Sequence, residues 1–244
     1  DLCKEQGGMP FLTDCNTLYP GSRKNALEHL TCAQLNGFWP MTTGCQVIIA
    51  DGLRGTDEAE VPVPNGEYCK TAKIGRAIMD ADIFISLTHF KGHESTGFGG
   101  ALKQLSIGVA SSYGKAYIHG AGDAKVGFGA DHDSFLASMA DAASSVAKRF
   151  AGKAVYINVM KNLSVDCDCC AVAENPCMAD IGIMASLDPI AIDQACVDMV
   201  YAATDDPGQQ HMLERIESRH GIYTIECAAG LGFGSREYER VDLD

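Results

Sequence analysis

The chain has 244 residues, of which 46% are hydrophobic and 21% are charged. A chain of this length buries enough surface to form a globular core. Its 19 basic and 32 acidic residues give a net charge of −13, which repels phosphate backbones and anionic lipid surfaces. No apolar run approaches the roughly 18 residues that a membrane span requires. We therefore expect neither nucleic acid nor a membrane as a partner.

The 11 cysteines are an odd number in a large chain, and no charged-then-apolar leader precedes Leu2. These features favour reduced thiols over a disulfide scaffold, and we expect a cytoplasmic protein in which some thiols ligate metal. The chain begins at Asp1 rather than at a methionine and soon reaches a strand near Met9. We expect that an upstream segment is missing.

The first 50 residues predict a strand, a helix and a second strand. Residues 9–13 form the first apolar run, and Ser22 is a suitable N-cap for a helix that ends at Gly37. The continuous apolar run 46–50 is typical of a buried parallel strand, and Asp51 follows it directly.

The next segment predicts a surface excursion and then a third strand. Residues 56–68 are rich in proline and acidic residues, which favours a surface loop or hairpin. A short helix is expected at 74–79, and the strand 82–87 leads to Thr88 and His89.

The second half of the chain repeats this alternation. Residues 114–130 contain many glycines and predict a loop or bridge. Helical spacing of apolar residues follows at 135–150, and buried strands are expected at 154–159 and 181–185. Asp188 and the proline after it predict the start of another helix.

These elements predict a single α/β domain over residues 1–244, with a mostly parallel or mixed sheet flanked by helices. In such sheets ligands bind beyond the carboxyl ends of the strands. We therefore expect a ligand cleft there, shared by Asp14, Asp51 and His89, with Arg54 and His93 in the same cleft.

The densest chemical signal is the segment 89–103, in which histidines and lysines alternate with glycines before a predicted helix start. Basic side chains and free N–H groups at a helix N-terminus would bind an anion. The alternative is a solvated loop whose glycines serve turns and whose histidines bond to the backbone.

Four blocks of the chain resemble the family of uncharacterised iron–sulfur-centre proteins, a domain of unknown function. These blocks are Thr13–Tyr19, Ile49–Gly55, His89–His93 and Asp180–Ile183. Many members carry a ferredoxin insert after the segment that matches 114–119. This chain has only the glycine-rich bridge 114–130 there and no Cys-x-x-Cys-x-x-Cys run, so ferredoxin-type clusters are not implied.

The chain also resembles, more distantly, the N-terminal domain of lactate-racemase-type nickel-pincer enzymes. His93, the segment 97–100, Lys103 and His119 follow in the order that those enzymes show. The resemblance implies that Lys103 anchors the pincer cofactor, that His119 ligates nickel and that His93 acts as acid or base. It also implies that an Asp-x-x-Arg pair contacts substrate or cofactor, here Asp51 and Arg54. The second proton-transfer histidine has no clear equivalent, and His89 is a candidate.

A cysteine cluster at 167–170, with Cys177 seven residues on, is the other candidate site. Thiolates are soft ligands for a metal or an iron–sulfur cluster. Cys167 and Cys169 are the stronger candidates because they match the family block. The alternative is that these cysteines are buried or merely reduced.

The candidate residues fall into three sets. The candidate catalytic residues are His89, His93 and Lys103. The candidate substrate or anion ligands are Asp14, Asn16, Asp51, Arg54, Lys91, Gly99 and Gly100. The candidate metal ligands are His93, His119, Cys167 and Cys169. We expect the remaining histidines on helix surfaces or at helix ends, namely His29, His132, His211 and His220.

Three functions follow from these residues. The first is an enzyme that binds a metal or metal cofactor, containing nickel, zinc or iron, and performs acid/base or redox chemistry on a small anionic molecule. The second is a non-enzymatic iron–sulfur or metal-binding redox module that uses Cys167 and Cys169. The third is a metal-free protein that binds a small anion. A homodimer or a redox partner is compatible with each.

Overall fold

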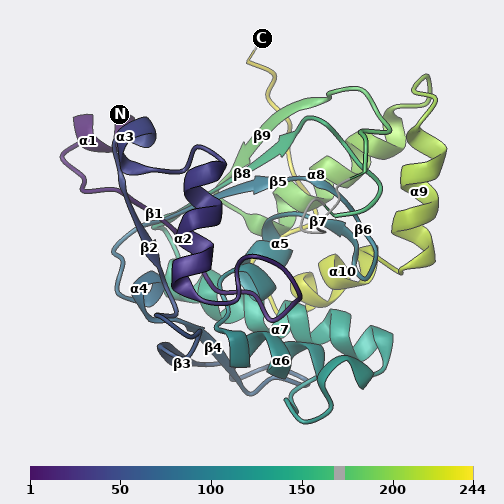
Figure 1. Cartoon of the computed structure of the whole chain (residues 1–244). Helices are drawn as coiled ribbons and strands as arrows, with labels where there is room; N and C mark the ends of the chain where they lie inside the picture. Colours follow the sequence, from purple (N-terminus) through teal and green to yellow (C-terminus); the bar gives the residue numbers. More distant parts are fainter. Residues whose placement is uncertain (168–173, 244) are drawn as a thin grey trace.

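The computed structural model describes residues 1–167 and 174–243 (Figure 1). The helices are α1 (Leu2–Glu5), α2 (Ala26–Leu35), α3 (Pro40–Thr43), α4 (Arg76–Met79), α5 (Ala101–Lys103), α6 (Ser112–His119), α7 (His132–Arg149), α8 (Pro189–Ala202), α9 (Gln209–Ser218) and α10 (Ile222–Gly230). The strands are β1 (Phe11–Asp14), β2 (Gln46–Ile49), β3 (Glu58–Pro62), β4 (Thr71–Gly75), β5 (Phe84–His89), β6 (Lys91–His93), β7 (Gly97–Gly99), β8 (Ala154–Met160) and β9 (Gly182–Ser186). A π-helical turn, η1 (Gln104–Gly108), continues α5, and a 3₁₀ turn, η2 (Gly127–Gly129), precedes α7.

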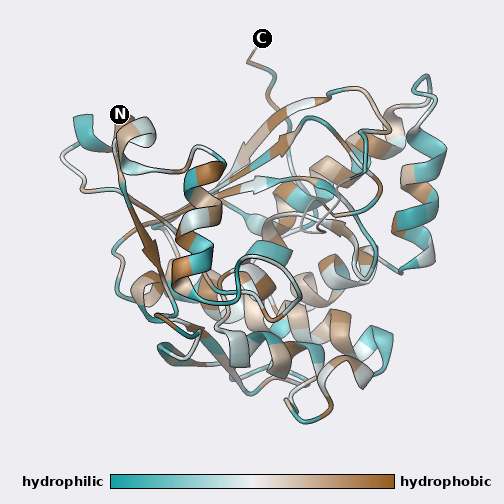
Figure 2. Cartoon of the chain, viewed as in Figure 1, coloured by the Kyte–Doolittle hydropathy of each residue, from teal (hydrophilic) through white to brown (hydrophobic). Residues whose placement is uncertain are grey.

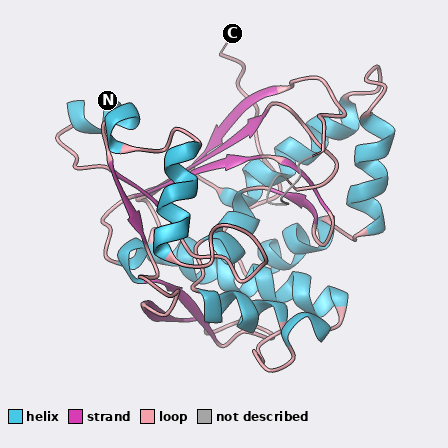
Figure 3. Cartoon of the chain, in the orientation of Figure 1, coloured by secondary structure: helices cyan, strands magenta, loops and turns pink. Residues whose placement is uncertain are grey.

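The described strands form small sheets of mixed direction that pack against helices (Figure 3). β1 pairs with β2 in parallel, and β5 pairs with β8 in parallel. β9 joins β8 in antiparallel direction, while β3 with β4 and β6 with β7 form antiparallel hairpins. The predicted α/β fold with a mixed sheet is confirmed. It is not mostly parallel, because the hairpins and β9 add antiparallel pairs.

The sheet of β5, β8 and β9 is buried on one face only. On β5 the inward side chains Phe84, Ser86 and Thr88 are buried, whereas the outward side chains Ile85 and Leu87 are exposed. The same face continues onto β9, where Ile183 is exposed. The ribbon of β9 is partly brown, for hydrophobic residues, in Figure 2. Successive side chains of a strand point to opposite faces, so the alternation follows from strand geometry. The exposed face of this sheet therefore carries apolar side chains.

Helix α7 is the centre of the core. Asp131 caps its N-terminus by accepting a hydrogen bond from the Ser134 N–H, and the helix is buried along most of its 18 residues. It packs against α10, η1, α6 and β4, and so connects the parts of the molecule that come before and after it in sequence. The helix predicted at 135–150 is confirmed. Its apolar stripe at helical spacing explains why it can be buried.

Helix α8 begins as its sequence predicts. The Asp188 side chain accepts from the N–H groups of Ile190 and Ala191, and Pro189 occupies the first helical position. Proline is suited to that position because its missing N–H would have no intrahelical partner there.

Three local predictions were wrong, and the short helix predicted at 74–79 is present as α4 but begins only at Arg76. Helix α2 is capped by Asn25 rather than by Ser22, because the Asn25 side chain accepts from Leu27 and Glu28. The glycine-rich bridge 114–130 is a helix in its first part, since Ser111 caps α6. The expected loop at 89–103 contains the β6–β7 hairpin, and the strand β4 extends through Gly75 before α4 begins. In each case a cap or a strand partner outweighed the glycine content or the apolar spacing.

Within the described ranges, none of the helices combines the length and apolar character needed to span a lipid bilayer.

Candidate functional site

The carboxyl ends of β1 and β2 bring Asp14, Asn16 and Asp51 together. Asn16 donates from both its backbone N–H and its Nδ2 to Asp51 Oδ1, each at 2.9 Å, and from Nδ2 to the Gly52 carbonyl at 2.8 Å. Asn16 and Asp51 are completely buried. The two strands are parallel and adjacent, which is why their terminal loops meet.

Asp14 lies beside His29, which the sequence had placed on a helix surface. That prediction was wrong, because His29 is buried and its Nε2 lies 3.5 Å from Asp14 Oδ2. Arg23 Nη1 lies 3.7 Å from the same oxygen. Burial opposes ionisation of Asp14, but its hydrogen bond with His29 and the charge of Lys115 hold its pKa below the usual value. Asp14 is therefore an anion at neutral pH, already paired with the protein's own groups.

Asp51 differs from Asp14 in its surroundings. Burial raises its pKa, although the Asn16 N–H and the Lys115 charge oppose the shift. Its second oxygen, Oδ2, has no hydrogen-bond partner among the described residues, and the same is true of Asn16 Oδ1 and Thr13 Oγ1. The backbone of Ser112, at the start of α6, also favours the charged form of Asp51.

Lys115 is the principal residue that the sequence reasoning missed. It lies on α6, has 3% of its surface exposed, and donates from Nζ to the Ala110 carbonyl at 2.6 Å. Its charge acts on Asp14, Asp51 and His119. Its position four residues before His119, on the same helix face, was the available signal. The reading of 114–130 as a loop hid that signal.

His93 ends β6 and is held by the turn of the hairpin. Its Nδ1 accepts hydrogen bonds from the N–H groups of Ser95, at 3.0 Å, and Thr96, at 3.2 Å. Two amide donors on Nδ1 leave the proton of the neutral ring on Nε2. His93 therefore presents a hydrogen-bond donor to its surroundings.

Cys167 and Lys103 lie near His93. Burial lowers the pKa of His93, and the Lys103 charge lowers it further, whereas a hydrogen bond with Cys167 and the charge of Glu94 oppose the shift. Cys167 is itself buried. The other cysteine of the predicted pair, Cys169, and Cys170 lie outside the described residues. The described cysteines are free thiols.

The N-terminus of α5 is occupied by a carboxylate of the protein itself. Asp193, on α8, accepts from the N–H groups of Ala101 at 2.7 Å and Leu102 at 2.8 Å, and from Asn158 Nδ2 at 2.8 Å. A Cβ at Gly100 would lie 2.4 Å from Asp193 Oδ1, so the glycine makes room for this carboxylate. The expected anion site at the helix start, with Gly99 and Gly100, is thus filled internally.

His119 is the last residue of α6. Its Nε2 is 2.6 Å from the Tyr19 hydroxyl, and its ring stacks on Phe135 at a centroid distance of 4.6 Å. Burial and the charges of Lys103, His93 and Lys115 lower its pKa to about 4. The imidazole is therefore neutral at pH 7 and retains a nitrogen lone pair. A neutral imidazole is the form that binds a transition metal.

Lys103 is half-buried, and its charge depresses the pKa of both His93 and His119. The structure thus brings His93, Lys103, His119 and Cys167 into one neighbourhood. Three elements supply the first three residues: β6, α5 and α6.

Lys91 adjoins Lys103, because a Cβ at Gly99 would lie 3.6 Å from Lys91 Cε and 3.5 Å from Lys103 Cδ. His89 Nε2 is 2.7 Å from the Lys161 carbonyl, and Lys91 Nζ donates to the His89 carbonyl at 3.1 Å. Arg54 is exposed. The catalytic and substrate roles expected for His89, Lys91 and Arg54 stay predictions.

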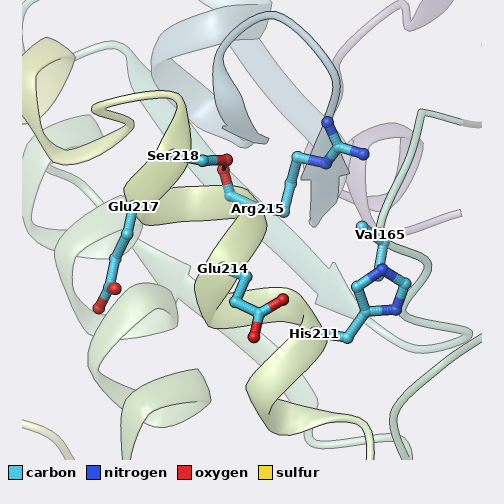
Figure 4. Close-up of a pocket in the computed structure, with 6 residues that line it drawn as sticks. All are labelled: Val165, His211, Glu214, Arg215, Glu217 and Ser218. Atoms are coloured by element: carbon cyan, nitrogen blue, oxygen red, sulfur yellow. Dashed lines mark hydrogen bonds between the residues drawn. The ribbon is translucent and has the colours of Figure 1, made fainter.

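Over the described residues, no group of three or more His, Cys, Asp or Glu side chains is arranged to hold a metal ion. The surface hollow of about 520 Å³ shown in Figure 4 is a different feature, because none of the candidate residues lines it. It lies along α9 and is lined by Val165, His211, Glu214, Arg215, Glu217 and Ser218. Arg215 also forms a 2.9 Å ion pair with Asp166, which precedes Cys167.

The fold and the polar edge of its strands define an α/β protein with clustered ionisable side chains. Residues 1–198 match the family model described as a domain of unknown function (DUF362), and the chain belongs to that family. This match confirms the first resemblance drawn from the sequence, and it carries no information on an iron–sulfur centre. No curated protein matches the chain.

Among solved structures, the chain is similar to the lactate racemase apoprotein from Thermoanaerobacterium thermosaccharolyticum. The superposition has a TM-score of 0.53 at 13% sequence identity, and it covers 81% of this chain and 42% of the other. The chain therefore spans less than half the length of that protein. At this identity the similarity concerns the fold, and it agrees with the second resemblance.

Proposed function

We propose that this protein is an enzyme that binds a metal or metal-bearing cofactor through His119 and Lys103 and acts on a small anionic molecule. The observation that carries the proposal is the placement of the His119 ring, which stacks on Phe135 at the end of α6 with its Nε2 at the Tyr19 hydroxyl. The ring is a neutral imidazole close to the Lys103 charge, in a chain whose fold resembles that of a lactate racemase apoprotein. A transition metal bound there would supply Lewis-acid or redox chemistry that the side chains lack.

Each side chain has a separate task in this proposal. His119 offers a nitrogen lone pair once the Tyr19 hydroxyl moves away, and Lys103 supplies an amine or a positive charge beside it. His93 has its one donor on Nε2, because its Nδ1 already accepts two amide hydrogens, and in this proposal that donor turns from Cys167 to negative charge on the substrate when substrate binds. Acceptance of a proton by Nε2 would require the other tautomer, so the geometry favours donation over base catalysis and over metal ligation by His93.

The second candidate function is a redox or metal module that uses Cys167 and Cys169. The observation that favours it is the burial of Cys167 and its hydrogen bond with His93. A donor beside a thiol stabilises the thiolate, which is the form that ligates metal.

Elemental analysis of anaerobically purified protein tests both candidates. We expect about one nickel, zinc or iron atom per chain without acid-labile sulfide, and we expect His119→Ala to lose the metal. His211→Ala is the matched control because His211 is an exposed helical histidine outside the site. Iron with acid-labile sulfide, lost in Cys167→Ser, would favour the module. Metal-free wild-type protein that takes up none of the three metals would refute both.

A further inference from the structure

Three aromatic rings contact the His119 imidazole. Phe135 stacks on it, with centroids 4.6 Å apart and an angle of 15° between the planes. Phe128 lies at a centroid distance of 4.5 Å, and Tyr19 meets the ring edge-on at 5.7 Å, with its hydroxyl 2.6 Å from Nε2. The rings of Tyr19 and Phe128 also contact each other, at 6.0 Å. Tyr19 therefore covers the nitrogen of His119, and Phe128 packs against both rings.

The two phenylalanines differ in how firmly the protein holds them. Phe135 belongs to α7 and is only 7% exposed, so the core fixes its position. Phe128 lies in the short turn η2 and is 65% exposed. Because most of the Phe128 side chain is already in water, its movement away from His119 and Tyr19 would expose little further apolar surface. Phe128 is thus the ring that can leave at low cost.

The turn that carries Phe128 has glycines on both sides of the ring. Gly127 has a φ of +56°, and a Cβ there would meet no atom within 4 Å, while one at Gly129 would make only an ordinary contact at 3.7 Å. The chain is fixed before and after the turn, since a Cβ at Gly122 would lie 2.4 Å from a carbonyl oxygen and Asp131 caps α7. The turn can therefore move between two fixed points without disturbing the core.

We propose that Tyr19 and Phe128 form a movable cover over His119 Nε2, which opens to admit a metal ion and closes to exclude water. In the closed state the Tyr19 hydroxyl lies at the nitrogen and Phe128 packs on both rings. Opening moves Phe128 into solvent about its flanking glycines and releases the Tyr19 hydroxyl from Nε2. This inference deepens the proposed function, on which it rests for the role of His119 as a ligand.

Each residue of the cover can be removed separately. Tyr19→Phe removes only the hydroxyl, so Nε2 loses its partner while the ring remains. Phe128→Ala removes the outer ring, and Tyr19 loses the side chain that packs against it. Because each change favours the open state, each should make His119 more accessible.

Acylation by diethyl pyrocarbonate, located by peptide mapping and mass spectrometry, measures this access on the whole metal-free chain at pH 7. His211, an exposed histidine of α9, serves as the reference within each sample. The open state of a two-state cover is a minor state of up to about 10%, so we expect His119 of wild type to react at least about 10-fold more slowly than His211. Tyr19→Phe and Phe128→Ala should each raise the His119 rate at least about 3-fold.

Val126→Ala is the matched control, because Val126 is an exposed apolar residue just before the same turn. It should leave the His119 rate unchanged, and the His211 rate should be the same in all variants. Wild-type His119 that reacts as fast as His211, or an unchanged His119 rate in folded Tyr19→Phe or Phe128→Ala, would overturn the proposal.

A time course of Ni²⁺ uptake, measured as metal content after rapid desalting, separates the cover from the proposed function. We expect Tyr19→Phe and Phe128→Ala to take up Ni²⁺ faster than wild type and Val126→Ala. Faster acylation of His119 in the two variants without any uptake of Ni²⁺, zinc or iron would confirm a cover over the ring and refute the metal-binding role of His119.

Discussion

His93 and His119 show how the surroundings of a residue decide its chemistry. Both rings are neutral at pH 7, since burial and the Lys103 charge lower both pKa values. The two rings differ in which nitrogen is held by a hydrogen bond. The hairpin amides occupy Nδ1 of His93, whereas the contact of His119 Nε2 is with a hydroxyl that can rotate or move away. One ring is therefore suited to donate a hydrogen bond and the other to act as a ligand.

The pKa of His119 predicts a specific pH dependence of stability. Its folded-state pKa is about 4, below the usual value of about 6.5, so the folded state binds fewer protons between these values. Stability from this group is present above about pH 6.5 and is lost as the pH falls toward 4, by about 3 kcal/mol. We expect His119→Gln to remove this loss, measured as the free energy of unfolding in urea from pH 4.5 to 7.5.

Asp193 changes stability with pH in the direction opposite to His119, so the test has to compare wild type with His119→Gln. Burial raises its pKa to about 6, so its folded state retains a proton and stability from this group falls as the pH rises from about 4 to 6. The wild-type curve contains both effects. The difference between wild type and His119→Gln isolates the histidine, and a difference that does not vary with pH would contradict the assigned pKa.

A substitution at Gly100 tests whether the Asp193 carboxylate holds the start of α5. Gly100→Ala would place a methyl group 2.4 Å from Asp193 Oδ1, and we expect it to destabilise the fold by about 1–3 kcal/mol, as overpacking does. Gly99→Ala is the control, because a Cβ there would lie no closer than 3.5 Å to any neighbour. Urea unfolding of the two variants measures the difference. Equal stability would mean that Asp193 does not hold the start of α5.

At the scale of elements, the sequence predicted those features that depend only on interactions between residues close in the chain. The start of α8 at Asp188-Pro189 and the apolar stripe of α7 require only neighbouring residues, and both were predicted. The contact of Asp193 with Ala101 joins residues 92 positions apart, and that of Asp51 with Asn16 joins residues 35 apart. No spacing rule reveals such pairs. The sequence therefore indicated Asp14, Asn16 and Asp51 as a group but not the roles of Asp193, His29 and Lys115.

The open face of the β5, β8 and β9 sheet gives an element-scale prediction. Leu87 is 67% exposed, so Leu87→Ala should change the free energy of unfolding by no more than about 0.5 kcal/mol. Leu136, on α7, is completely buried, and Leu136→Ala should cost about 2–5 kcal/mol. Urea unfolding measures both. A loss above about 2 kcal/mol for Leu87→Ala would show that the outer face is covered in solution.

At the scale of the whole molecule, the small sheets are joined through one core. Cys15, after β1, donates from Sγ to the Val109 carbonyl, and the Ala77 N–H donates to the carbonyl of Ala50. A Cβ at Gly75 would lie 2.6 Å from Cys15 Sγ, which shows how closely β4 approaches this loop. The strands β1 and β2 are thus attached to the same core as α7, although they pair only with each other among the described strands.

This attachment predicts that the chain unfolds as one cooperative unit. Trp39 is the only tryptophan and lies between α2 and β2, so its fluorescence reports on the N-terminal part, whereas far-UV circular dichroism reports mainly on the helices that follow. Because Cys15 and Ala50 belong to the common core and lie against Gly75, separation of β1 and β2 would expose buried surface at the end of β4. We expect both signals to give the same urea midpoint and the same m-value within error. A fluorescence transition at lower urea than the dichroism transition would instead identify the β1–β2 part as an independently unfolding unit, held to the remainder by fewer interactions than the structure contains.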